Sequence, residues 1–94
     1  MAQTILQSNK ECYITQSTSG LHKHHIFGGA NRRKSEKYGL WVWLRADWHN
    51  IAGYGVHFNK ELSHRLKREA QAAAMQKYGW TKEQFIAMFG RNYL

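Results

Sequence analysis

The chain has 94 residues, which is the length of one small domain, so we expect a single domain and not a large multi-domain protein. Hydrophobic residues make up 43% of it and charged residues 21%, a balance that is typical of a folded globule and excludes a disordered chain. Fourteen Lys and Arg against six Asp and Glu give a net charge of +8, which favours nucleic acid as the partner and an anionic membrane second.

Two further features of the composition restrict the class of protein. No apolar run approaches the roughly 20 residues of a membrane span, and the first ten residues lack the basic-then-apolar order of a signal peptide. We therefore expect a cytoplasmic protein that does not enter a membrane. Cys12 is the only cysteine, so an internal disulfide and a four-cysteine zinc site are excluded. Any metal site must be built mainly from the six histidines.

The first half of the chain predicts strands joined by polar segments. Residues 3–7 alternate weakly and predict a short edge strand. A strand is then expected over Leu21–Phe27, ending at two glycines, and a polar, basic connection over Ala30–Lys37. Leu40–Leu44 predicts a second strand. Its alternation places Leu40, Val42 and Leu44 on one face and Trp41 and Trp43 on the other.

The second half predicts helices with recognisable ends. Asp47 is a plausible N-cap of a short helical turn that carries Trp48 and His49. Asn59 caps a long helix over Lys60–Tyr78, which Gly79 closes. Its apolar stripe is expected to consist of Leu62, Leu66, Ala70 and Ala73.

A last helix is expected to begin at Thr81, where Thr81 and Gln84 have the spacing of a capping box. Its buried side is expected to consist of Phe85, Met88 and Phe89.

Histidine is concentrated in one part of the chain, since five of the six fall between His22 and His57. Neighbouring residues of a strand point to opposite faces, so His24 and His25 must have different roles: one can face a metal while the other faces a water beside it. Neutral imidazole suits Zn, Ni, Co or Mn, and three protein ligands leave the open position that a catalytic site requires.

Several segments in this order resemble the HNH endonuclease family, especially its small phage-encoded members. They are LHKHHIFGG at 21–29, YGLWVWL at 38–44, His49, and GVHFN at 55–59. The similarity continues to FGRNYL at 89–94 and covers about residues 12–94. It implies an α+β fold with a ββα-metal core that contains a β-hairpin and is followed by C-terminal helices. The whole chain, 1–94, would then be a single nuclease domain with its core at about 12–59 and its helical part at about 60–94.

The resemblance also implies residue roles. His24 would be a metal ligand and His25 the general base that activates water. His49 and His57 would complete the ligand set of one divalent cation, which could be Mg, Mn, Ni, Co or Zn, although His57 follows His49 by eight residues instead of the common four. His22 shares a strand face with His24 and could be an extra ligand or a phosphate contact. The run Arg32, Arg33 and Lys34 could be solvated charge, and beside a metal it is interpreted as binding DNA phosphates.

The sequence departs from this family at a structural zinc site that many members carry. Cys12 remains, but Thr15, Arg45 and Trp48 stand at the other ligand positions. We therefore expect no structural zinc, with Trp48 and Tyr13 packing in its place. The residue that orients His25 is left open: Gly39 and Leu40 stand where an asparagine is common, and a backbone carbonyl of the second strand is an alternative.

The function that follows is hydrolysis of DNA phosphodiester bonds with low sequence specificity, in the cytoplasm of a phage-infected or lysogenic bacterial host. The main alternative is a catalytically inactive phage protein that keeps the HNH scaffold as a DNA- or protein-binding module. A purely structural zinc finger is disfavoured because the cysteines are missing. His64 is interpreted as an ordinary surface histidine.

Overall fold

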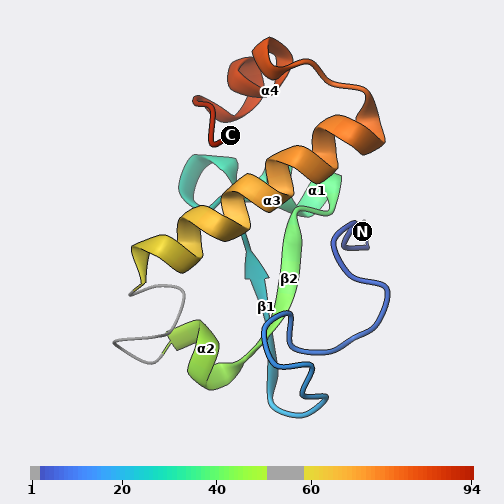
Figure 1. Cartoon of the computed structure of the whole chain (residues 1–94), viewed down its shortest axis with the longest axis vertical. Helices are drawn as coiled ribbons and strands as arrows, with labels where there is room; N and C mark the ends of the chain where they lie inside the picture. The colour runs from blue at the N-terminus through green and yellow to red at the C-terminus, as the bar shows by residue number, and fades with distance from the viewer. Residues whose placement is uncertain (1–2, 51–58) are drawn as a thin grey trace.

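The computed structural model describes residues 3–50 and 59–94, which form an α+β fold around a two-stranded sheet (Figure 1). None of the helices within these ranges has the length and apolar character needed to cross a membrane. The elements in chain order are β1 (Leu21–His25), a 3-10 turn (Gly29–Asn31), α1 (Arg32–Tyr38), β2 (Trp41–Arg45), α2 (Ala46–Asn50), α3 (Lys60–Tyr78) and α4 (Lys82–Phe89).

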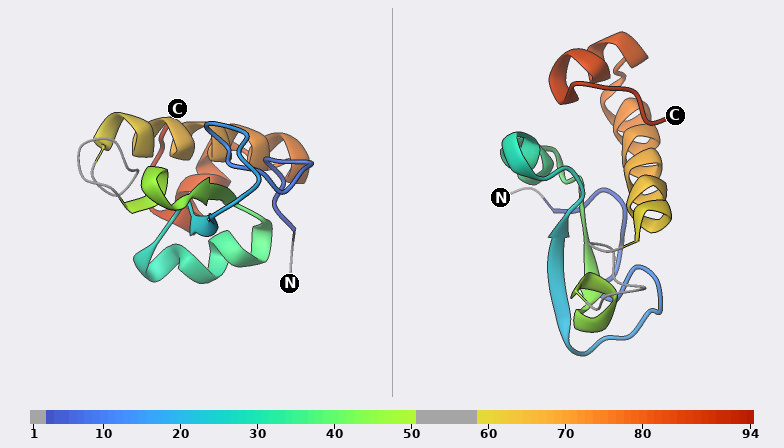
Figure 2. Two further views of the ribbon diagram at one scale, coloured as in Figure 1. Left: turned by 90° about the horizontal axis from the view of Figure 1, so that it is seen from below. Right: turned by 90° about the vertical axis from the view of Figure 1, so that its left-hand side faces the viewer.

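The sheet is an antiparallel pair in which His24 lies opposite Val42 and His25 lies opposite Trp41. Helices α3 and α1 lie on opposite sides of this hairpin (Figure 2). The expected alternation of the second strand is confirmed: Leu40, Val42 and Leu44 are fully buried in the core with α3, whereas the two tryptophans occupy the other face. Each face of β1 therefore meets a different helix.

The connection between the strands differs from the expectation, because Arg32–Tyr38 is the helix α1 and not an irregular loop. The segment contains no proline, glycine or β-branched residue, so nothing in it opposes helix formation. Gly39 ends the helix in the left-handed conformation, with φ 72°. Ser35 is fully buried, and its hydroxyl exchanges hydrogen bonds with the backbone N–H and C=O of Phe27 at 3.0 and 2.8 Å. These bonds attach α1 to the end of β1.

The predicted edge strand at residues 3–7 is wrong, although this segment does run beside the sheet. The N–H of Ile5 donates to the carbonyl of Gly39 at 3.0 Å. Further along, the N–H of Trp43 donates to the side-chain oxygen of Gln7 at 2.8 Å. A side chain thus replaces the backbone partner that a regular strand would supply.

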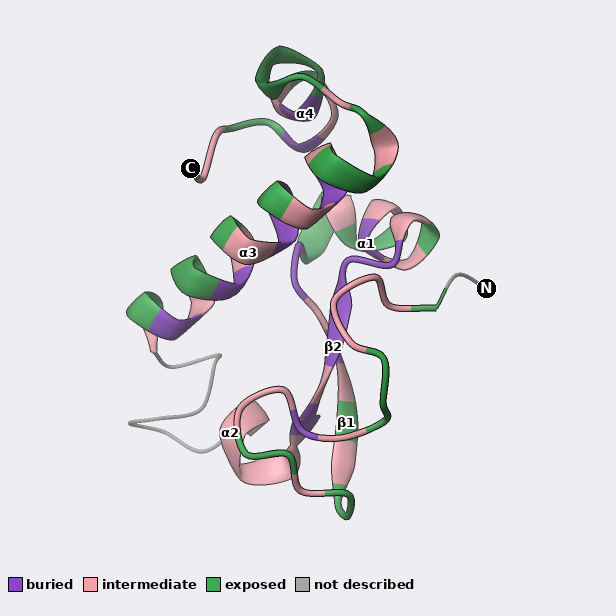
Figure 3. Ribbon diagram, turned by 45° about the vertical axis from the view of Figure 1, so that its right-hand side comes forward, coloured by how far each residue is buried: buried purple, intermediate pink, exposed green. Residues whose placement is uncertain are grey.

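Helix α3 has the predicted ends. The side chain of Asn59 accepts a hydrogen bond from the N–H of Leu62 at 3.0 Å, and Gly79 closes the helix in the left-handed conformation. The predicted apolar stripe is corrected at one position, because the buried residues continue at a spacing of four to Ala74 while Ala73 is only half-buried. The buried side of α3 faces the hairpin (Figure 3). The complete buried set is Leu62, Leu66, Ala70, Gln71 and Ala74.

The two shorter helices differ more in their details. Helix α2 begins at Ala46, so Asp47 lies inside its first turn and is not the N-cap. The carboxylate of Asp47 instead accepts two hydrogen bonds from the guanidinium of Arg45, at 2.7 and 2.6 Å. In α4 the capping box of Thr81 and Gln84 is confirmed.

The apolar side of α4 attaches this helix to the end of β1. Phe85 and Phe89 are buried as expected, whereas Met88 is half-buried. The ring of Phe27, two residues after β1, contacts both phenylalanines, at centroid distances of 5.7 and 4.9 Å. The C-terminal helix therefore shares its core with the strand that carries the paired histidines.

Candidate functional site

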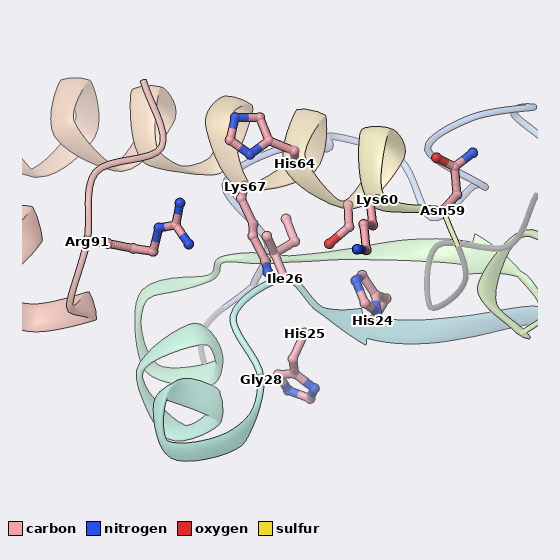
Figure 4. Close-up of a pocket in the computed structure, with 10 residues that line it drawn as sticks. His24, His25, Ile26, Gly28, Asn59, Lys60, His64, Lys67 and Arg91 are labelled. Carbon is pink, nitrogen blue, oxygen red and sulfur yellow. The ribbon is translucent and has the colours of Figure 1, made fainter.

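The paired histidines leave β1 on opposite faces of the sheet. His24 is 8% exposed and lies on the face that α3 covers, whereas the side chain of His25 lies on the face of α1 and is 13% exposed. Figure 4 shows His24 pointing toward the start of α3 and His25 pointing away from it. The two imidazoles are therefore in different chemical surroundings, as strand alternation requires.

On the α3 face, His24 meets His49 of α2. Their ring centroids are 5.2 Å apart at an interplanar angle of 67°. His22 also approaches His49, and the Nδ1 atoms of these two rings are 3.4 Å apart. This separation is about that of two nitrogen ligands on a tetrahedral ion with bonds of about 2.1 Å. The donor set is imidazole, which fits the divalent transition metals.

Within residues 3–50 and 59–94, no three metal-ligating side chains converge on one point. His57 belongs to residues 51–58 and lies outside the described residues. The structure therefore brings His24 and His49 together, adds His22 beside them, and leaves the predicted third ligand without a position.

On the α1 face, His25 is bonded to a carboxylate that the sequence reasoning missed. Its Nε2 lies 2.8 Å from Oε1 of Glu36, and Nζ of Lys23 lies 3.1 Å from the same oxygen. Hydrogen bonds from His25 and then Lys23 lower the pKa of Glu36 below its ordinary value of 4.5. Glu36 is therefore placed to orient His25. The sequence contains one indication of this residue, because Glu36 is the only acidic residue between Glu11 and Asp47.

The predicted basic run divides into two parts in the structure. Arg32 and Arg33 are exposed and line a pocket of about 580 Å³ together with His25 and Glu36. Lys34 points elsewhere, because its ammonium donates to the backbone carbonyl of Met88 near the C-terminus of α4. Two of the three cations thus lie beside His25, and the third attaches α4 to α1.

A larger cleft, of about 700 Å³, lies on the other side between β1, the first half of α3 and the residues after α4 (Figure 4). Its lining includes both paired histidines and carries no Asp or Glu from the described ranges. The residues with ionisable side chains among those that line it are His24, His25, Lys60, His64, Lys67 and Arg91. Its charge is therefore positive.

The segment around Cys12 packs into the hydrophobic core and is hydrogen-bonded to α3. Cys12 is fully buried, and Tyr13 and Trp48 pack against the hydrophobic core. The hydroxyl of Tyr13 donates to the carboxylate of Glu69 on α3 at 2.5 Å. Burial and this hydrogen bond raise the pKa of Tyr13 to about 12.

Comparison with known protein families, with curated proteins and with solved structures finds no match to this chain. The function must therefore be argued from the arrangement of the residues. That arrangement is a carboxylate-bound imidazole on one side of a strand, an imidazole pair on the other, and cationic side chains around both.

Proposed function

We propose that this chain is a metal-dependent endonuclease that hydrolyses DNA phosphodiester bonds with low sequence specificity. The observation that carries the proposal is the different setting of the two adjacent histidines: His24 packs beside His49, and His25 is bonded to Glu36. The order of a hairpin followed directly by a short helix supports it, because the ββα-metal core of the HNH nucleases has this order.

The metal would be held by His24 and His49, with His57 as the third ligand and His22 as the nearest reserve. The fit rests on the imidazole donors that the structure gathers around His49. A divalent cation bound there, Mg, Mn, Ni, Co or Zn, supplies charge neutralisation at a phosphoryl oxygen and at the leaving 3′ oxygen.

His25 would be the general base. A neutral imidazole has one N–H donor and one acceptor nitrogen, and the carboxylate of Glu36 accepts only from a donor. The contact at Nε2 therefore favours the tautomer in which Nδ1 carries the free lone pair and removes a proton from water. Glu36 does not touch the reacting atoms. It is a positioning residue that also stabilises the imidazolium formed when the proton is taken.

Arg32 and Arg33 would hold a phosphate that flanks the scissile bond, since both line the pocket beside His25. Lys34 would contribute through its charge, because its ammonium already donates to Met88.

Incubation of the purified protein with supercoiled plasmid and each of Mg²⁺, Mn²⁺, Ni²⁺, Co²⁺ and Zn²⁺ tests the proposal. Nicking is expected with at least one cation. His25→Ala should abolish nicking and keep metal affinity in calorimetry, whereas His24→Ala and His49→Ala should lose both. Metal and DNA binding without turnover would contradict the proposal and identify the alternative, a catalytically inactive HNH-scaffold phage protein acting as a DNA- or protein-binding module.

A further inference from the structure

The residues after α4 form a tail that is fixed to α3 by a buried amide. Gln71 is fully buried, and its Nε2 donates to Oδ1 of Asn92 at 2.8 Å. Its Oε1 accepts from the N–H of Tyr93 at 2.7 Å. A buried amide with both ends hydrogen-bonded holds a segment in one position, because breaking either bond leaves a polar group unsatisfied in the core. Arg91, next to these two tail residues, is therefore held at the cleft.

Basic side chains from α3 and from the tail contact the ring of Tyr93. Cζ of Arg91 lies 5.1 Å from the ring centroid, Nζ of Lys67 lies 5.6 Å from it, and the ring of His64 packs edge-on at 6.1 Å. These distances are those of cation–π contacts for the two cations. The same ring packs on Phe27 at 5.4 Å, so the aromatic core supports the cluster. Arg91 reaches from the tail toward Lys67 (Figure 4).

The cations in this cleft form a line that runs from the Tyr93 ring, where Lys67 and Arg91 lie, along α3 to Lys60. Lys60 and Lys67 are seven residues apart on α3, which is about 10 Å along a helix axis. One strand of B-DNA carries a phosphate about every 3.4 Å of its axis, so this length spans about three phosphates. The acidic Glu69 is engaged elsewhere, with Tyr13 and Arg65. The line fits an extended chain of phosphates better than a single one.

We propose that Lys60, Lys67 and Arg91 bind backbone phosphates along one nucleic acid strand, and that the tail completes this surface by presenting Arg91. That a phosphate of this strand would be cleaved beside His24 and His25 rests on the proposed nuclease function. The binding of the strand by Lys60, Lys67 and Arg91 does not. The surface lies across β1 from Arg32 and Arg33, so a bound strand would be held on both sides of the paired histidines.

The test is the affinity of the whole chain for a fluorescent DNA duplex of arbitrary sequence, measured in EDTA over a range of salt concentrations. Arg91→Gln should weaken binding on the order of tenfold, the effect of losing one charge-assisted hydrogen bond. The slope of log K against log salt should become shallower by about 0.9. Lys82→Gln is the matched control, because it removes the same charge from an exposed position on α4 outside the cleft, and it should change affinity less than about twofold.

A second variant tests the role of the tail. Gln71→Leu keeps the volume of the buried side chain but removes both hydrogen bonds to the tail, so it should weaken DNA binding as well. Arg91→Gln added to Gln71→Leu should then cost much less than it does alone. Independent, additive effects would show that Gln71 does not hold Arg91 in place.

The outcomes separate this inference from the nuclease proposal. Equal affinity of Arg91→Gln and the parent, or a loss no larger than that of Lys82→Gln, overturns the inference even if the parent cleaves plasmid. Weaker binding by Arg91→Gln supports it even if no cation gives cleavage. If Arg91→Gln instead weakens binding to phosphatidylserine vesicles and leaves DNA binding unchanged, the surface binds a membrane and the inference is wrong.

Discussion

Replacing Glu36 by Gln removes the negative charge beside His25 and keeps the size and shape of the side chain that His25 contacts. The carboxylate is 28% exposed and is shared with Lys23, so solvent and the ammonium both weaken its effect. A hydrogen bond to a charged group contributes about 1.5–3 kcal/mol and a neutral one about 1 kcal/mol. We therefore expect the substitution to remove about 1.4 kcal/mol of transition-state stabilisation, which lowers kcat about tenfold.

The assay is plasmid nicking at saturating cation, with kcat and KM determined separately. Glu36→Gln should lower kcat and leave metal affinity unchanged, because Glu36 is proposed to act through His25 and is not among the proposed metal ligands. Glu83→Gln is the matched control, since it removes one exposed carboxylate from α4 and should have no effect. An unchanged kcat, or a rise in KM alone, would refute the assignment of Glu36 as the group that positions the base.

Stability gives an independent measure of the same contact. The pKa of Glu36 is lowered by His25 and Lys23, so the ionised carboxylate stabilises the fold above pH 4.5, and this contribution is lost as the pH falls below that value. The free energy of unfolding of Glu36→Gln, measured by urea titration, should therefore depend less on pH in the acidic range than that of the parent. Equal acid dependence of the two proteins would contradict the contact.

Two further predictions concern the fold. Burial and the bond to Glu69 raise the pKa of Tyr13 to about 12, so the protonated phenol stabilises the fold fully below pH 10 and loses this effect between pH 10 and 12. Tyr13→Phe should flatten the unfolding free energy over this range in urea titrations, and an unaltered alkaline loss would refute it. Gly39→Ala and Gly79→Ala both place a side chain at φ near 70°, but only at Gly39 does the new Cβ meet a backbone atom, the carbonyl oxygen of Gln3 at 2.3 Å. Gly39→Ala should therefore lower the melting temperature more than Gly79→Ala, and equal melting temperatures would contradict this contact.

The long helix and the last helix were predictable because their ends depend on local chemistry. Asn59 and Thr81 each accept a hydrogen bond from a backbone N–H three residues later, and Gly79 adopts the conformation that glycine favours. Helix α1 was missed because its charged sequence lacks an apolar stripe. It is held by Ser35 and Gly39, whose contacts with Phe27 and the N-terminal segment appear only in three dimensions.

The site was predictable to the extent that it depends on one strand. Alternation alone separates His24 from His25, and the structure has this arrangement. Glu36 could not be assigned, because its position depends on the helix that the sequence did not predict. Arg91 could not be assigned either, since it reaches the cleft only through the buried amide of Gln71, 20 residues earlier in the chain.

The two hydrogen bonds of Ser35 to Phe27 have a consequence for evolution and engineering. They join the chain on both sides of Gly28–Asn31, whose three exposed residues bury nothing, and they link the neighbours of His25 and Glu36 directly. Loop closure costs only about 0.6 kcal/mol for each doubling of length, so we expect residues inserted between Gly28 and Asn31 to be tolerated. New loops inserted at this point would therefore leave the spacing of His25 and Glu36 unchanged.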